Sequence, residues 1–189
     1  MNSLLPAAAA LACALSMPAL AQEVYTIDPA HTYPTFEVSH LGFSTQRGTF
    51  TRSSGRVVLD RTAKRGSIDI GIDAASLDTG HAKRDEALRG EDFFNVTRHA
   101  TIAYRSTALK FDGEALVGAD GELTLLGVTR PVPLKVSAFK CGVHPLSRKA
   151  LCGADATATL RRSEFGMKAF LPAVGDDVRI VIQIEAFRD

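Results

Sequence analysis

The stretch SIDIGID, residues 67–73, decides the fold class of this chain. Its isoleucines fall on one side of an extended chain and its aspartates on the other. Such alternation with a period of two is typical of a β-strand with one buried face. The pattern is longest near the C-terminus, where one face carries Val178, Ile180, Ile182, Ile184 and Ala186.

Shorter alternating runs recur along the chain, with turn residues between them. They lie at 35–39, 48–51, 56–60, 100–104, 114–126, 132–136 and 155–161. The pairs Asp112-Gly113 and Asp120-Gly121 are hairpin signals when strands flank them. About eight strands joined by short turns predict an all-β antiparallel barrel, because closure removes the exposed edges of a sheet. A two-sheet sandwich is the alternative.

One segment, DTGHAKRDEALRG at 78–90, breaks the alternation and predicts a short helix. A helix with so few apolar positions is not stable alone and must pack on the sheet. We expect it to form a lid across one end of the barrel, with Leu88, Phe93 and Phe94 turned inward.

Length and charge restrict the class of protein. The chain has 189 residues, the usual size of one domain. Its 22 basic and 21 acidic residues leave a net charge of +1, far from the positive field that nucleic-acid binding requires. We therefore expect one folded domain and no nucleic-acid partner.

The N-terminal segment predicts export. Residues 1–21 contain no charged side chain and end in Ala19-Leu20-Ala21, the small-x-small pattern that signal peptidases cut. We expect a signal peptide over 1–21, a mature domain over 22–189, and no stable membrane insertion after cleavage. A membrane anchor is the alternative, although the apolar run is shorter than the ~20 residues needed to cross a bilayer.

Cleavage would remove Cys13 and leave Cys141 and Cys152. Export favours a disulfide between them, with two free thiols as the alternative. Closing a loop of about a dozen residues is expected to stabilise the fold by ~3 kcal/mol. Because the C-x-x-C spacing of redox enzymes is missing, we assign the pair a structural role.

The sequence gives little support for catalysis or metal binding. The five histidines lack the close spacing of metal ligands, although folding could bring His31 and His40 together with an acidic residue. No nucleophile elbow, phosphate loop or dinucleotide motif occurs. Arg84 and Asp85 could form an active-site ion pair, but a buried structural pair that fastens the lid helix is the favoured interpretation.

Phenylalanines are spread over several predicted strands and the lid, and many should face inward. An eight-stranded barrel is just wide enough either to be filled by its side chains or to hold one small ligand. Alternation alone does not decide between these two interiors.

The order of the motifs decides it, because together they resemble the YceI-like family of exported proteins. The similarity covers nearly all of the mature chain in four blocks. These are IDPAHT at 27–32 with Phe36, HLG at 40–42 and GTF at 48–50; SLDTG at 76–80 with Arg84-Asp85, Leu88 and DFF at 92–94; GELTLLGVTRPV at 121–132; and RSEFGM at 162–167.

The resemblance implies a lipocalin-like barrel in the periplasm that binds a polyisoprenoid or other long-chain lipid, such as an isoprenoid quinone. We expect that the protein requires no cofactor or metal, and a homodimer is possible. The apolar cavity residues would be Phe36, Val38, Leu41, Phe43, Phe50, Leu88, Phe93, Phe94, Ile102 and Phe165. The polar residues at its mouth would be His31, His40, Arg84 and Asp85.

Two alternatives from other classes remain. One is an enzyme that acts on a bound lipid, an isomerase or hydrolase that uses a histidine and an aspartate at the mouth. The other is a solid barrel that serves as a protein-interaction module.

Overall fold

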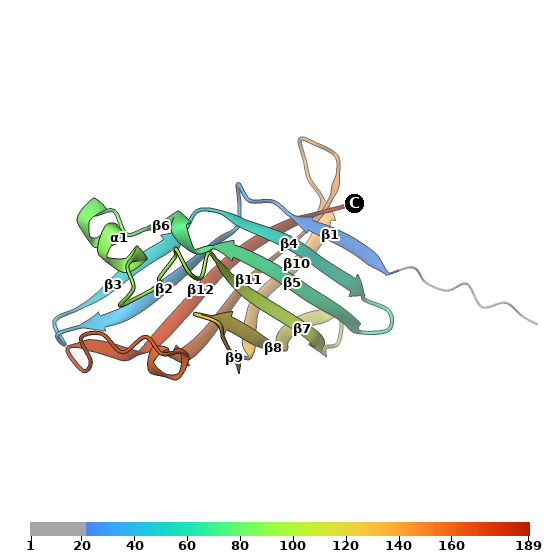
Figure 1. Cartoon of the computed structure of the whole chain (residues 1–189). Coiled ribbons are helices and arrows are strands. Elements are labelled where there is room, and N and C mark those ends of the chain that lie inside the picture. Colours follow the sequence, from blue (N-terminus) through green and yellow to red (C-terminus); the bar gives the residue numbers. More distant parts are fainter. Residues whose placement is uncertain (1–21) are drawn as a thin grey trace, which may run out of the picture.

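The computed structural model in Figure 1 describes residues 22–189. The predicted signal peptide at 1–21 lies outside these residues. The strands are β1 (Glu23–Ile27), β2 (Tyr33–His40), β3 (Ser44–Phe50), β4 (Ser53–Asp60), β5 (Arg65–Asp73), β6 (Leu77–Asp78), β7 (Thr101–Asp112), β8 (Ala115–Leu125), β9 (Val128–Pro131), β10 (Leu134–Val143), β11 (Ala150–Arg161) and β12 (Val174–Arg188). The helices are α1 (Ala82–Arg89) and the 3-10 turns η1 (Ala74–Ser76) and η2 (Arg162–Phe165).

The strands form one closed antiparallel sheet. Its order is β1-β4-β5-β7-β8-β10-β11-β12-β2-β3-β6, and pairing of β1 with β12 completes the circle. β1 and β2 both pair with β12, and β9 and β10 both pair with β8, so each of these two pairs of segments forms one strand of the barrel. In the same way β3 and β4 pair with β2 and β1 on one side and with β6 and β5 on the other, so β3 with β4 and β5 with β6 also count as one strand each. The structure is therefore an eight-stranded barrel, as predicted, and not a sandwich.

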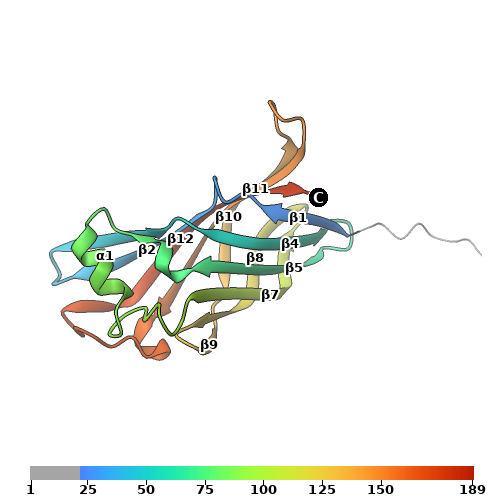
Figure 2. The same cartoon turned by 45° about the horizontal axis from the view of Figure 1, so that its top comes forward.

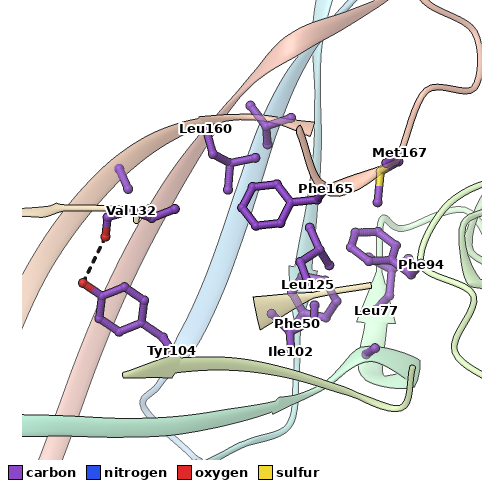
Figure 3. Close-up of a cluster of buried hydrophobic side chains, with 13 residues drawn as sticks. Phe50, Leu77, Phe94, Ile102, Tyr104, Leu125, Val132, Leu160, Phe165 and Met167 are labelled. Atoms are coloured by element: carbon purple, nitrogen blue, oxygen red, sulfur yellow. Dashed lines mark hydrogen bonds between the residues drawn. The ribbon is translucent and has the colours of Figure 1, made fainter. Parts of the chain in front are cut away.

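Alternation places the apolar faces inside this barrel. Two clusters of buried side chains result, one around Phe50, Leu77, Phe165 and Met167 and a second around Tyr25, Leu59 and Cys152. Figure 3 shows the first cluster, to which β3, β6, β7, β8, β11 and the loops near α1 all contribute.

The predicted lid helix is α1, which lies over one end of the barrel (Figures 1 and 2). The side chain of His81 caps its first turn by accepting a hydrogen bond from the backbone N–H of Arg84 at 3.3 Å. Its last turn is held by Arg89, which donates to the carbonyl oxygens of Ala75, at 2.9 Å, and Leu77. These bonds fix the helix to η1 and β6 instead of leaving it a free flap.

The predicted disulfide is present and joins Cys141 to Cys152. The two cysteines face each other across β10 and β11, where the strands leave the barrel wall as a projecting hairpin (Figures 1 and 2).

One predicted turn is wrong. Asp120-Gly121 lies within β8, not between strands. A Cβ atom at Gly121 would collide with the hydroxyl oxygen of Tyr104, so the glycine serves the packing of that ring.

Candidate functional site

The barrel interior holds a cavity of about 250 Å³ that is lined by residues of both clusters. A void of roughly 10–15 Å³ already holds one water, so this space is far larger than a packing defect. It lies close to the lower limit of ~300 Å³ for typical ligand sites. The interior is therefore hollow, and the solid-barrel alternative does not describe it.

The cavity lining is almost entirely apolar, and the alternating stretches supply most of it. Every isoleucine of 67–73 lines the cavity. The inward face of β12 does so through Val178, Ile180, Ile182, Ile184 and Ala186. Further aliphatic side chains come from Val57, Leu59, Leu116, Leu123, Leu125, Val132, Leu134, Val136 and Leu160. Leu123, Leu125 and Val132 belong to the third family motif. The other residues lie outside the motifs, and the period-two pattern places many of them on the inner face.

Most of the predicted apolar site residues also line the cavity. They are Phe36, Val38, Phe50, Leu88, Phe93, Phe94 and Ile102. Three of them form an aromatic trio below the lid, with ring centroids 6.2 Å apart for Phe36 and Phe50 and 5.4 Å apart for Phe50 and Phe94. The Phe36 ring lies directly over Gly48 of the adjacent strand, where a Cβ atom would collide with it.

Three predicted lining residues lie elsewhere. Leu41 and Phe43 belong to the β2–β3 turn, where the alternation ends, and they are 54% and 90% exposed. Phe165 belongs to η2, which leaves the barrel wall, and it is 1% exposed within the first cluster (Figure 3). Its environment is packed protein and not the cavity.

Polar groups next to the cavity already have partners. The Tyr104 hydroxyl donates to the carbonyl oxygen of Val132 at 3.1 Å (Figure 3), and burial raises its pKa to about 12. The Tyr25 hydroxyl donates to Glu23 at 2.7 Å, and burial followed by that hydrogen bond raises its pKa to about 12. Both hydroxyls therefore stay neutral near pH 7 and have no free proton to donate to a ligand.

Arg162 is a charged cavity residue that the sequence interpretation missed, apart from its place in the fourth motif. It is 3% exposed. Its guanidinium donates to the carbonyl oxygens of Gly175 at 2.8 Å, Met167 at 3.1 Å, and both Ala169 and Val174 at 2.9 Å. The side chain thus ties the loop before β12 to the barrel.

Arg84 and Asp85 do not form the predicted ion pair in the part of the chain that the structure describes. The Asp85 carboxylate accepts hydrogen bonds from the Thr79 amide at 2.9 Å and the Thr79 hydroxyl at 2.5 Å. Arg84 donates to the Thr79 hydroxyl and carbonyl oxygens, each at 2.8 Å, and to Gln46 at 2.9 Å. Neither residue lines the cavity.

The two histidines predicted at the mouth are not brought together. His40 is exposed at the end of β2. His31 lies before the other end of that strand, and its Nδ1 is 2.7 Å from Asp28 Oδ2. This hydrogen bond raises the pKa of His31 and lowers that of Asp28. With Glu185 they place three potential metal ligands within 4.8 Å of one another, but His40 is not among them.

A profile of the YceI-like domain matches residues 25–186. The chain belongs to the YceI-like family. Protein YceI of Shigella flexneri is 34% identical over 164 residues, which cover 85% of each chain. The UPF0312 protein of Ectopseudomonas mendocina (strain ymp) is 34% identical over 167 residues, which cover 87% of each.

Solved structures share the YceI-like fold. Burkholderia cenocepacia BcnA superposes with a TM-score of 0.72 at 23% identity, covering 85% of this chain and 99% of that one. A polyisoprenoid binding domain from Saccharophagus degradans gives a TM-score of 0.64 at 16% identity, covering 87% and 98%. At these identities the likeness establishes the barrel, while the cavity of this YceI-like chain is defined by its own residues.

Proposed function

We propose that this YceI-like protein binds the apolar chain of a polyisoprenoid or another long-chain lipid, such as an isoprenoid quinone, and carries or sequesters it in the periplasm. The observation that carries the proposal is the cavity inside the barrel, whose lining is almost entirely aliphatic and aromatic and includes one charged residue, Arg162. Such a space excludes water and accepts hydrocarbon, because burial of apolar surface is the main favourable term in binding.

The hydrogen-bonding state of the cavity supports a binder more than an enzyme. Its hydroxyls and the Arg162 guanidinium are already engaged by protein acceptors. An enzyme that acts on a bound lipid would need a free acid, base or nucleophile next to the reacting atoms. His31, His40, Arg84 and Asp85 are absent from the cavity lining, so they do not supply one there.

Apolar burial also suggests how selective the site would be. One isoprene unit contributes roughly 4 kcal/mol nominally, at ~0.8 kcal/mol for each buried carbon. The affinity for lipids of different chain length would therefore depend on how much of the chain fits inside the cavity and not on recognition of a head group. The solved Saccharophagus degradans domain, described as polyisoprenoid binding, is a precedent for such a ligand on this fold.

The test is native mass spectrometry of protein purified without detergent, followed by solvent extraction of any bound molecule. Ala158, 9% exposed, lines the cavity, and its neighbour Thr159 is exposed on the outer face of β11. Ala158→Phe should fill the space, while Thr159→Phe adds the same side chain outside the barrel.

We expect a mass excess that extracts as a prenyl or long acyl lipid in wild type and Thr159→Phe, and little or none in folded Ala158→Phe. Protein that stays bare after incubation with such lipids would overturn the proposal. Equal lipid loading of both variants would show that the lipid binds outside the cavity.

A further inference from the structure

Among residues 22–189, three of the six large apolar side chains that are exposed lie at one end of the barrel. Leu41 and Phe43, 54% and 90% exposed, form the β2–β3 turn, and Phe170, 66% exposed, lies in the loop before β12. Both segments lie at the same end as α1, in both views of Figures 1 and 2. We name Leu41, Phe43 and Phe170 the apolar tip.

The apolar tip is held in place by the fold. The Leu41 amide donates to the carbonyl oxygen of Ala173 at 2.6 Å, which joins the turn to the loop. Arg162 fixes the same loop by donating to the carbonyl oxygens of Met167 and Ala169 before Phe170 and of Val174 after it. Leu41 and Phe170 adopt positive φ angles of 54° and 59°, which bulky side chains rarely do. These hydrogen bonds and backbone angles thus fix both loops in the conformation that leaves the two side chains exposed.

The apolar tip continues into the cavity. Phe170 stacks on Phe93 with ring centroids 6.0 Å apart and an interplanar angle of 18°. Phe93 in turn lines the cavity, as do Val38 and Val174 at the bases of the two segments. A hydrocarbon chain could follow this apolar surface from the outside of the protein to its interior.

The charge of the two segments that form the apolar tip fits a phospholipid surface, and the acidic residues Glu91 and Asp92 lie in the neighbouring turn after α1. The turn at 40–44 and the loop at 166–173 carry His40 and Lys168 and no acidic residue. Among residues 22–189, Lys168 takes part in no salt bridge. Aromatic side chains next to a lysine are typical of segments that lie at the membrane–water interface.

We propose that the apolar tip docks this protein reversibly on a phospholipid bilayer, so that the end of the barrel beside the lid faces the membrane. The docking rests on the proposed function, since a lipid cargo would leave or enter a bilayer. Phe43 and Phe170 would enter the interfacial region, with Lys168 next to the phosphate groups.

The chain contains no tryptophan, so one introduced indole reports on one place. We would compare Phe43→Trp with Leu146→Trp, which lies in the projecting β10–β11 hairpin and is 87% exposed. Both positions are exposed, so neither change should disturb folding. The probe is vesicles of phosphatidylcholine and phosphatidylglycerol, free of isoprenoid lipid, with brominated phosphatidylcholine as a depth-dependent quencher.

We expect the Phe43→Trp emission to shift to shorter wavelength and to be quenched by brominated lipid, while Leu146→Trp stays unshifted. A Phe43→Glu variant should bind vesicles at least roughly tenfold more weakly in co-sedimentation, given the area of a buried phenyl ring. No shift for Phe43→Trp, or equal shifts at both sites, would overturn the proposal. A shift that grows with protein concentration without vesicles would overturn it in favour of a second copy of this chain.

The same Phe43→Trp sample is examined by native mass spectrometry. A shift on vesicles in protein that never carries lipid would contradict the proposed function and leave the docking surface standing. Loaded protein without a shift would contradict the docking alone.

Discussion

Arg84 and Asp85 are adjacent in the chain, yet each binds Thr79 and not the other. The Thr79 hydroxyl donates to Asp85 at 2.5 Å and accepts from Arg84 at 2.8 Å, so one oxygen links the two opposite charges. Asp85 is 7% exposed, and these bonds compensate for its lost hydration. The trio fastens α1 to the segment before it and to Gln46 of β3.

This arrangement predicts a defined pH dependence. Hydrogen bonding from Thr79 lowers the pKa of Asp85 below its ordinary value. A carboxyl group whose pKa is lowered by folding stabilises the protein above its unfolded pKa and loses that contribution as pH falls through the folded pKa. Asp85→Asn should therefore cost about 1–3 kcal/mol of unfolding free energy near pH 7, with a smaller difference from wild type below about pH 3.5.

Urea denaturation of both proteins across this pH range measures the difference. Asp92→Asn, at an exposed position in the neighbouring turn, is the control and should stay within about 0.5 kcal/mol of wild type near pH 7. A wild-type advantage over Asp85→Asn that persists undiminished at about pH 2.5 would contradict the assigned role of the carboxylate.

Gly48 controls the position of the Phe36 ring. Because a Cβ atom there would collide with the ring, Gly48→Ala should push Phe36 toward the cavity and destabilise the fold by about 1–3 kcal/mol. Gly71→Ala is the matched strand control, since its nearest atom would be 3.7 Å away. Lipid occupancy by native mass spectrometry should fall only for Gly48→Ala, and equal occupancy in the two variants would argue against a ligand near Phe36.

The disulfide should stabilise the hairpin. Cys141→Ala with Cys152→Ala removes a cross-link over about a dozen residues and should cost ~3 kcal/mol in the chain-entropy model. Thermal unfolding with and without a thiol reductant measures the loss, and the double variant serves as the control because reductant should not change it further. A wild-type midpoint that does not respond to complete reduction would show that the bridge carries no stability.

The sequence predicts the barrel because period-two alternation is a local property that survives in β5 and β12. It also predicts the disulfide and the lid helix, whose signals lie within short segments. It fails at Leu41, Phe43 and Phe165, which follow or interrupt strands, since alternation says nothing about side chains in a turn.

Contacts between distant segments are harder to predict. Gly121 resembles a turn residue until Tyr104 is seen to cover it from the neighbouring strand. Within residues 22–189, the hydrogen-bond acceptors of Arg162 are all backbone carbonyl groups, which any residue type supplies, so the sequence does not reveal them. The Thr79 bridge likewise depends on the geometry of the first helical turn.

Closure of the barrel depends on β12. Its fifteen residues pair with β11 on one side and with β1 and β2 on the other, which joins the two edges of the sheet. The barrel cannot close until β12 has paired, and pairing of β1 with β12 spans almost the whole described sequence. Such non-local pairing is slow to form. A chain in which β12 has not yet paired would therefore expose its apolar lining to water, and the cavity would form only when β12 joins the sheet.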